Sequence, residues 1–311
     1  MEDGKVNLFV VGAMRAGTTS FMQLLSRHPN IYVSPIKEPH YFVDSLPNSI
    51  FEPLQEGFVD RYFKKQFPKP IHRARITNAE EYQKLFSLAQ HHAYRAEGSI
   101  SYLHAPEAAK KIHEYNPNAK IVIISRNPLQ RAVSHYKMDL GLLREKKPME
   151  SVIIREMTAY KEGTLKWSSL LGMSFYNDPI LRFNHYFGKK VLHLTSEELF
   201  QETEKTLLKV SVFLGIEDFS DVQFESVNAT RKLRFQKMFF WLKKIGLIRF
   251  LSWVVPTTVK HKIFHSVSTP SNSEIHLSEK TLEELNDIFT IESSCHPAGL
   301  DRSDGLRTLE S

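Results

Sequence analysis

The chain has 311 residues, of which 41% are hydrophobic and 24% charged, and its formal net charge is +6. This composition is typical of a soluble globular protein, and the length suits a single α/β domain. The only cysteine, Cys295, excludes an intramolecular disulfide, and no uncharged apolar run of about eighteen residues predicts a transmembrane helix. The positive charge favours an anionic partner, with nucleic acid and a phosphorylated small molecule both open.

The N-terminal sequence MEDGKVNLFVV lacks the basic stretch and the long apolar segment of a secretory signal. Together with the single cysteine, this start predicts a cytoplasmic protein in reducing surroundings. This start of the chain does not decide between nucleic acid and a phosphorylated small molecule as the anionic partner.

Three short runs rich in β-branched residues predict buried strands, and each leads towards a helical pattern. These runs lie at 6–11, 120–125 and 190–195. The first continues into a helical pattern over 18–27, and another helix is expected at 105–115, with Pro106 in its first turn. Strands that alternate with helices predict a parallel sheet covered on both faces.

A last helix is expected near the C-terminus, where Ser278 can cap it. Its apolar face would consist of Leu282, Leu285, Ile288 and Phe289. We find no internal repeat and no linker, so the sequence predicts one domain over 1–311.

Two segments do not fit the alternation of strands and helices. Residues 43–95 are rich in aromatic residues and proline, and we expect loops and short helices laid over the sheet. Residues 235–255 are apolar but interrupted by basic residues, so they fit a helical lid or an amphipathic segment on a membrane surface. We expect 43–95 and 235–275 to shape the acceptor site.

The sequence LFVVGAMRAGTTSF has the outline of a phosphate-binding loop, because an apolar strand leads through two glycines into a helix. In a nucleotide-hydrolysing loop a lysine follows the second glycine, whereas Thr18 stands here and Arg15 is the only cation of the loop. Gly12 and Gly17 allow the turn that directs successive amides at an oxyanion. The helix N-terminus and the hydroxyls of Thr18 and Thr19 complete a site for one phosphate. An ordinary βα turn is the alternative for this motif alone.

A second cation follows the strand at 120–125, which ends in Arg126. An Mg²⁺-dependent NTPase usually has an acidic residue there that orients the metal. Two cationic anchors without such a carboxylate suit a ligand that carries two separate phosphates and needs no metal.

Three stretches in this order resemble the sulfotransferases that use 3′-phosphoadenosine-5′-phosphosulfate (PAPS), most of all bacterial members related to the heparan sulfate sulfotransferase domains. FVVGAMRAGTTSF is similar to the 5′-phosphosulfate loop, HPNIYVSPIKEPHYF to the segment with the catalytic carboxylate, and AKIVIISRNPLQRAVSHYKM to the 3′-phosphate element. AEGSISYLHAPEAAKKIHEYNP fits the run between the last two. The likeness covers roughly residues 5–140, and the second half matches only as a pattern of strands and helices.

The resemblance implies a role for each matching residue. Glu38 would be the general base, His40 a polar residue of the acceptor site, and Arg15 the cation at the bridging oxygen between phosphate and sulfate. Arg126 and Ser134 would bind the 3′-phosphate. The 5′-phosphate would be bound by Arg15, Ala16, Gly17, Thr18, Thr19 and Ser20. The donor would be PAPS, the product adenosine 3′,5′-bisphosphate, and no metal would be required.

Two departures from the family pattern change these expectations. The family usually has lysine where Arg15 stands, and arginine can stabilise the leaving phosphate but cannot donate a proton to it. The family often has lysine after the glutamate that corresponds to Glu97, whereas Gly98 follows here. Lys37, beside Glu38, is a candidate to replace that cation.

Several other residues stay open between a structural and a functional role. Arg131 and His135 flank Ser134 and could face solvent or the sheet, and Ser99 and Tyr102 could line the acceptor cleft. A basic cluster, consisting of Arg231, Lys232 and Arg234, is either a solvated face or a group that closes over the 3′-phosphate or an anionic acceptor. The fourteen histidines show no metal-ligand spacing.

Together these observations predict a P-loop NTPase-like three-layer α/β sandwich that moves a sulfuryl group from PAPS to a carbohydrate or glycolipid. The acceptor group would be a hydroxyl or, as the less favoured choice, an amine. A kinase-like phosphotransferase and a basic protein that binds nucleic acid or a membrane surface are the alternatives. Under the first prediction we expect no nucleic-acid partner and a peripheral contact with the inner face of the membrane through 235–255. The sequence leaves the oligomeric state undecided.

Overall fold

The computed structural model describes residues 4–51, 57–142, 144–219, 231–233, 268–270, 275 and 277–294. The predicted lid or membrane segment at 235–255 and the basic residue Arg234 lie outside these ranges. Within the part of the chain that the structure describes, no helix has the length and apolar character needed to cross a bilayer.

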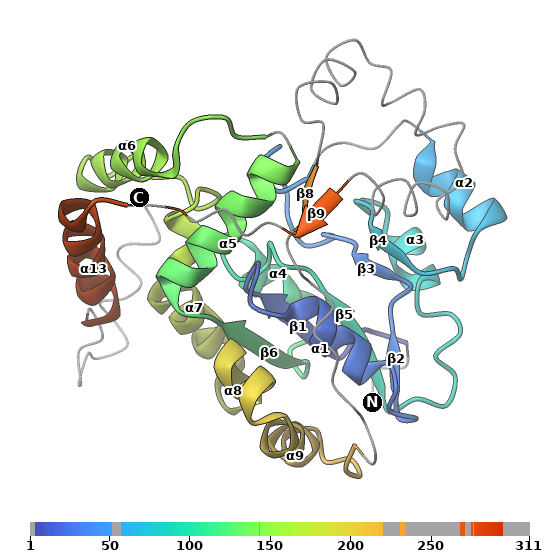
Figure 1. Cartoon of the computed structure of the whole chain (residues 1–311). Coiled ribbons are helices and arrows are strands. Elements are labelled where there is room, and N and C mark those ends of the chain that lie inside the picture. The colour runs from blue at the N-terminus through green and yellow to red at the C-terminus, as the bar shows by residue number, and fades with distance from the viewer. Residues whose placement is uncertain are drawn as a thin grey trace.

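A five-stranded sheet in the order β2-β5-β1-β6-β7 forms the centre of the molecule, and all its neighbouring strands run parallel (Figure 1). The strands are β1 (Leu8–Gly12), β2 (Ile31–Val33), β5 (Tyr94–Gly98), β6 (Lys120–Ser125) and β7 (Val191–Thr195). Because β1 lies between β5 and β6, the loops that follow these three strands meet at one edge of the sheet. In open parallel sheets, ligands bind at the carboxyl ends of the strands.

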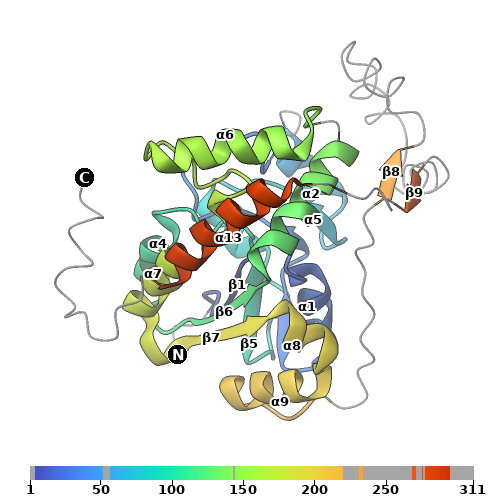
Figure 2. The ribbon, with the colours of Figure 1, turned by 60° about the vertical axis from the view of Figure 1, so that its left-hand side comes forward.

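Helices cover both faces of the sheet (Figure 2). On one face lie α4 (Ala108–Tyr115) and α7 (Asn177–Phe187), and on the other lie α1 (Thr18–Leu25) and α8 (Ser196–Gln201). Helix α9 (Thr203–Leu214) packs near β7 at the edge of the sheet. The three layers explain why β1 is apolar throughout, since successive side chains point to opposite faces and both faces are buried.

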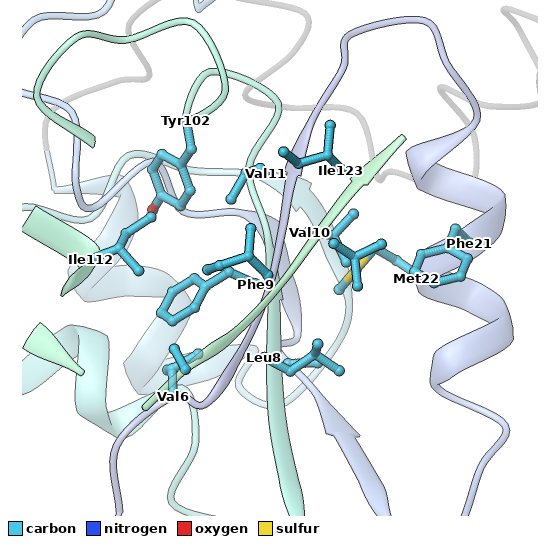
Figure 3. Packing of buried hydrophobic residues seen from close by; sticks show 14 of the residues in the cluster. Val6, Leu8, Phe9, Val10, Val11, Phe21, Met22, Tyr102, Ile112 and Ile123 are labelled. Atoms are coloured by element: carbon cyan, nitrogen blue, oxygen red, sulfur yellow. The ribbon is translucent and has the colours of Figure 1, made fainter. Parts of the chain in front are cut away.

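The core around β1 shows this alternation directly. Val10 faces Phe21 and Met22 of α1, whereas Phe9 faces Ile112 of α4 (Figure 3). All four of Val10, Phe9, Phe21 and Ile112 are at most 1% exposed. Apolar packing on both faces fixes the position of β1 in the sheet, and so fixes where the loop after β1 begins.

The remaining elements lie around the sheet. They are β3 (Ile36–Glu38), α2 (Phe58–Lys65), β4 (Ile71–Arg73), α3 (Ala79–Lys84), α5 (Pro128–Gly141), α6 (Met149–Lys161), the single-turn helices Gly172–Ser174 and Gly188–Lys190, β8 (Arg231–Leu233), β9 (Ser268–Pro270) and α13 (Glu279–Ser294). Strands β3 and β4 pair in parallel, and β8 and β9 pair in antiparallel fashion. Helices α5, α6 and α13 share a second apolar cluster beyond the sheet.

The strands and helices predicted from the sequence are present, with small shifts at their ends. The helix expected over 105–115 begins at Ala108, and Ser278 caps α13 through a 3.3 Å hydrogen bond from the amide of Thr281 to its Oγ. Leu285, Ile288 and Phe289 are buried as expected, while Leu282 is only partly buried.

The sequence did not reveal β5, which lies inside the sheet between β2 and β1. The interpretation of 43–95 as loops and short helices holds for α2 and α3 but misses β4 and the start of β5. The reason is that β5 carries Arg95 and Glu97, which read as exposed residues. Glu97 is in fact fully buried because hydroxyl groups surround its carboxyl.

Candidate active site

The loop between β1 and α1 has the backbone geometry of an anion site. Gly17 precedes the helix with φ of 97°, a left-handed conformation that favours glycine, and a Cβ there would lie 2.8 Å from Cε2 of Phe200. The first ladder bond of α1 runs from the amide of Phe21 to the carbonyl of Gly17 at 3.1 Å. The amides at the start of a helix are the groups that bind anions, and the first turn of α1 has no acidic residue that would repel an anion.

Neighbouring strands hold this loop in place through the backbone. The amide of Ala13 donates to the carbonyl of Ile124 on β6 at 2.6 Å, and the amide of Ala16 donates back to Ala13 at 3.2 Å. On the other side, the amide of Leu103 donates to the carbonyl of Val11 at 2.8 Å. The loop is thus held between Ile124 on β6 and Leu103, which follows β5.

The second cation lies directly against this loop. Arg126 follows β6, and its Nη1 donates to the backbone carbonyl of Arg15 at 3.3 Å. The next residue, Asn127, caps α5 by accepting from the amide of Gln130 at 3.1 Å, so a second helix N-terminus begins beside Arg126. Arg126 as a whole is partly exposed at this edge of the sheet.

Arg15 connects the two expected phosphate sites. Its backbone is left-handed, with φ of 69°, and its Nε donates to Oγ of Ser134 on α5 at 3.0 Å. Nη1 of Arg15 also lies 4.0 Å from Sδ of Met138, one turn further along α5. The arginine that replaces the family lysine therefore contacts the residue expected to bind the 3′-phosphate.

Glu38 is the buried carboxylate of the site. It ends β3, is 3% exposed, and its Oε1 lies 2.5 Å from Nζ of Lys37. Its Oε2 lies 3.6 Å from Nε2 of His40, which is an electrostatic contact rather than a hydrogen bond. Burial by itself would raise the pKa of Glu38, but Lys37 and His40 outweigh burial and hold that pKa well below its usual range. The carboxylate is therefore ionised at neutral pH.

Hydroxyl groups from the end of β5 hold His40. The amide of His40 donates to Oγ of Ser99 at 3.0 Å, and its Nδ1 lies 2.8 Å from Oγ of Ser101. If Ser101 donates to Nδ1, the ring carries its proton on Nε2, which then points at Glu38. His40 is fully buried and its φ is 51°, an uncommon conformation for a histidine.

The two residues left open on α5 face the interior. Arg131 is fully buried, where its Nε donates to Oγ of Ser174 at 2.8 Å and its Nη1 lies 3.3 Å from Nδ1 of His135. Nε2 of His135 lies 3.4 Å from Oδ2 of Asp139. Burial lowers the pKa of His135 and raises that of Asp139 to about 6. The contact of Arg131 with Ser174 holds α5 against the single-turn helix Gly172–Ser174.

The structure brings the expected site residues into two connected groups. The loop residues 12–20, Arg126 and Ser134 form the first, and Glu38 with His40 forms the second, joined to the sheet through Ser99. Ser99 and Tyr102, considered for the acceptor cleft, have no exposed surface and bond to Glu97 instead. The roles of Glu97 and Ser101 were missed, because a polar residue in a short strand carries no sequence signal of its partners.

The basic cluster is only partly visible. Arg231 and Lys232 belong to β8, which lies beside α5, and Arg234 is outside the described residues. Among the described residues, no group of three histidine, cysteine, aspartate or glutamate side chains could hold a metal ion.

Comparison with known sequences identifies related proteins. The family model described as "Sulfotransferase family" matches residues 7–221. Heparan sulfate glucosamine 3-O-sulfotransferase 3B1 of Mus musculus is 23% identical over 209 residues, which cover 67% of this chain and 45% of the relative. Bifunctional heparan sulfate N-deacetylase/N-sulfotransferase 1 of Caenorhabditis briggsae is 25% identical over 221 residues, which cover 68% of this chain and 23% of the relative. The chain thus spans less than half the length of these two relatives.

A solved structure shares the fold. The sulfotransferase from Alicyclobacillus acidocaldarius superposes with a TM-score of 0.62 at 22% identity, covering 93% of this chain and 92% of that chain. Together with the parallel sheet and its two helical layers, this likeness confirms the predicted P-loop NTPase-like three-layer sandwich.

Proposed function

Because the chain belongs to the sulfotransferase family, whose model matches residues 7–221, we propose that it transfers a sulfuryl group from PAPS to an acceptor hydroxyl. The observation that carries the proposal is the contact of Arg15 with Ser134, together with that of Arg126 with the Arg15 carbonyl. These contacts put two cations, one hydroxyl and a helix N-terminus around one edge of the sheet. A donor with a 5′-phosphosulfate and a separate 3′-phosphate matches that set.

The loop would bind the 5′-phosphate of the donor. The first-turn amides of α1 and the hydroxyls of Thr18, Thr19 and Ser20 supply hydrogen-bond donors, and Ala16 and Gly17 keep the backbone close. Arg126 and Ser134 would take the 3′-phosphate. Binding to a helix N-terminus and two guanidiniums needs no metal in this proposal.

In the transfer step, the acceptor oxygen forms a bond to sulfur while the bond from sulfur to the 5′-phosphate oxygen breaks. The electron pair of the broken bond stays on the phosphate, and the product is adenosine 3′,5′-bisphosphate. Arg15 would stabilise that developing charge as a fixed cation, since a guanidinium does not give up a proton. Glu38 would accept the proton of the acceptor hydroxyl, which requires an ionised carboxylate such as the one in this site.

The acceptor class is drawn from the relatives. The two named above act, by their names, on heparan sulfate, a carbohydrate. We therefore propose a hydroxyl of a carbohydrate, free or attached to a lipid, and give an amine second place. The first acceptor to try is a partially de-N-acetylated heparosan oligosaccharide, which offers both hydroxyls and free glucosamine amines.

Calorimetry with adenosine 3′,5′-bisphosphate in EDTA tests the donor proposal without knowledge of the acceptor. We expect binding that is unaffected by the chelator. Absence of binding, or binding of a nucleoside triphosphate only with added Mg²⁺, would overturn the proposal and favour a kinase-like phosphotransferase. Strongly salt-dependent binding to DNA without nucleotide would favour a nucleic-acid-binding protein instead.

A further inference from the structure

A buried carboxyl at the end of β5 has no role in the mechanism given above. Glu97 has no exposed surface and accepts three hydrogen bonds, all from hydroxyl groups. Oγ of Ser99 donates to its Oε1 at 2.6 Å, and Oη of Tyr82 and Oη of Tyr102 donate to its Oε2 at 2.7 Å and 3.2 Å. The three donors occupy three of the roughly four acceptor sites of an ionised carboxylate.

This arrangement is costly if its only purpose is to stabilise the sheet. The titratable groups that face Glu97 are Tyr82 of α3, Tyr102 after β5 and Tyr115 of α4, and none of them is a cation. Burial therefore raises the pKa of Glu97 to about 7, although the three hydroxyl groups oppose it. An apolar residue at a central strand position would stabilise the fold at lower cost.

Ser99 connects Glu97 to the catalytic segment. Its Oγ donates to Glu97 and accepts from the backbone amide of His40 at 3.0 Å. Glu97 thereby orients the Ser99 hydroxyl so that its lone pairs, and not its proton, face the His40 amide. Tyr102, three residues after Ser99, repeats this pattern. Its Oη donates to Glu97 and accepts from the amide of Phe42, two residues after His40, at 3.3 Å.

The bend at His40 needs the hydrogen bonds that Ser99 and Tyr102 provide. His40 has a left-handed backbone, with φ of 51°, and such a conformation in a residue other than glycine persists only where its surroundings impose it. The amides on either side of this bend, those of His40 and Phe42, are the ones that Ser99 and Tyr102 bind. Glu38 lies two residues before His40 and would move with the bend.

We propose that Glu97 is a positioning residue, which acts through Ser99 and Tyr102 to hold the bend at His40 and thereby the carboxylate of Glu38 at the site of transfer. The inference rests on the proposed function, in which Glu38 is the base. Displacement of a catalytic group by about 1 Å can cost as much as 100-fold in rate.

The main test compares Glu97→Gln and Ser99→Ala with Tyr82→Phe as the matched control. Tyr82→Phe removes a hydrogen bond to the same carboxyl but none to the catalytic segment. The measured rate is the total transfer of the labelled sulfuryl group from PAPS, to water or to the same heparosan-derived oligosaccharide, at saturating PAPS. We expect Glu97→Gln and Ser99→Ala to lower this rate by about 10- to 100-fold, and Tyr82→Phe to change it by less than about threefold.

Three further readouts separate positioning from a merely structural role. The affinity for adenosine 3′,5′-bisphosphate should stay unchanged in all variants, and the double variant Glu97→Gln/Ser99→Ala should lose no more rate than either single variant. The rate of the native protein should rise with pH near 7, as Glu97 ionises. In Glu97→Gln this rise in the pH–rate profile should be absent or weaker. The amide of His40 should exchange with solvent faster in Ser99→Ala than in the native protein.

Stability provides a check that is independent of turnover. A carboxyl whose pKa is raised on folding from 4.5 to about 7 stabilises the fold at pH values below 4.5, and this contribution is lost as pH rises to about 7. The Glu97→Gln variant should therefore not show this loss of folding stability between pH 4.5 and about 7. Equal rate effects in Tyr82→Phe and Ser99→Ala, or native rates in both Glu97→Gln and Ser99→Ala, would overturn the inference while the proposed function stands. Failure of the native protein to bind adenosine 3′,5′-bisphosphate would instead overturn the proposed function.

Discussion

The phosphate loop and the Glu38 segment both bond to residues that follow β5, Leu103 and Ser99, but the chain holds them by different means. Backbone hydrogen bonds to β6 and to the residues after β5 hold the loop, as from the amide of Ala13 to Ile124. The Glu38 segment belongs to the two-stranded β3–β4 ladder outside the main sheet, and buried side chains of Ser99, Ser101 and Tyr102 hold it.

This difference separates donor binding from chemistry. A site built on backbone amides tolerates side-chain substitution, and its affinity depends on the few cations that it adds. A site held by side chains loses its geometry when one hydroxyl is removed. Substitutions in the first region should therefore change mainly nucleotide affinity, except at Arg15, which in the proposed function also stabilises the leaving oxygen. Substitutions in the second region should change the rate.

The largest effect is expected for Glu38→Gln. The substitution keeps the shape of the side chain but removes the proton acceptor, so turnover should fall by about 10²–10⁴-fold. Affinity for adenosine 3′,5′-bisphosphate, measured by calorimetry, should remain native because Glu38 is outside the phosphate loop. Glu114→Gln, at an exposed position of α4, is the control. A large loss of nucleotide affinity in Glu38→Gln would remove the distinction between the two regions.

Arg126→Ala should have the next largest effect, and this effect should be on nucleotide affinity and not on turnover. Loss of a charged hydrogen-bond donor typically costs about 1.5–3 kcal/mol, so nucleotide affinity should fall by about 10- to 100-fold. The rate at saturating donor should change little. Arg155→Ala, on an exposed part of α6, should leave affinity unchanged. If Arg126→Ala mainly lowered the saturated rate, the assignment of Arg126 to the 3′-phosphate would be wrong.

Arg15→Lys should have the smallest effect and would sharpen the comparison within the loop. Lysine keeps the positive charge but loses the planar fork, by which arginine can contact Ser134 and a second group together. We expect both affinity and saturated rate to fall by about 3- to 10-fold, as for the loss of one hydrogen bond. Ser134→Ala should reproduce the affinity part of this loss. A native affinity in both variants would show that the contact between Arg15 and Ser134 has no part in donor binding.

The loop could be predicted from the sequence because its determinants are contiguous. Two glycines, a following helix and a strand rich in β-branched residues decide the backbone path within a few residues. The same holds for β6 and for Arg126, which directly follows it. The physical reason is that local conformation and burial on both faces are encoded in the order of neighbouring residues.

Only the tertiary structure decided how the rest of the site is assembled. Arg15 and Ser134 are 119 residues apart in the chain, and His40 and Ser99 are 59 apart. Whether Glu97 is exposed or buried depends on hydroxyl groups from α3 and from the residues after β5, which no local pattern specifies. The sequence by itself determined the anion loop and the order of the first motifs, because these depend on local backbone geometry. The fold decided which polar side chains meet in the interior, because such contacts exist only after the sheet and its helices have packed.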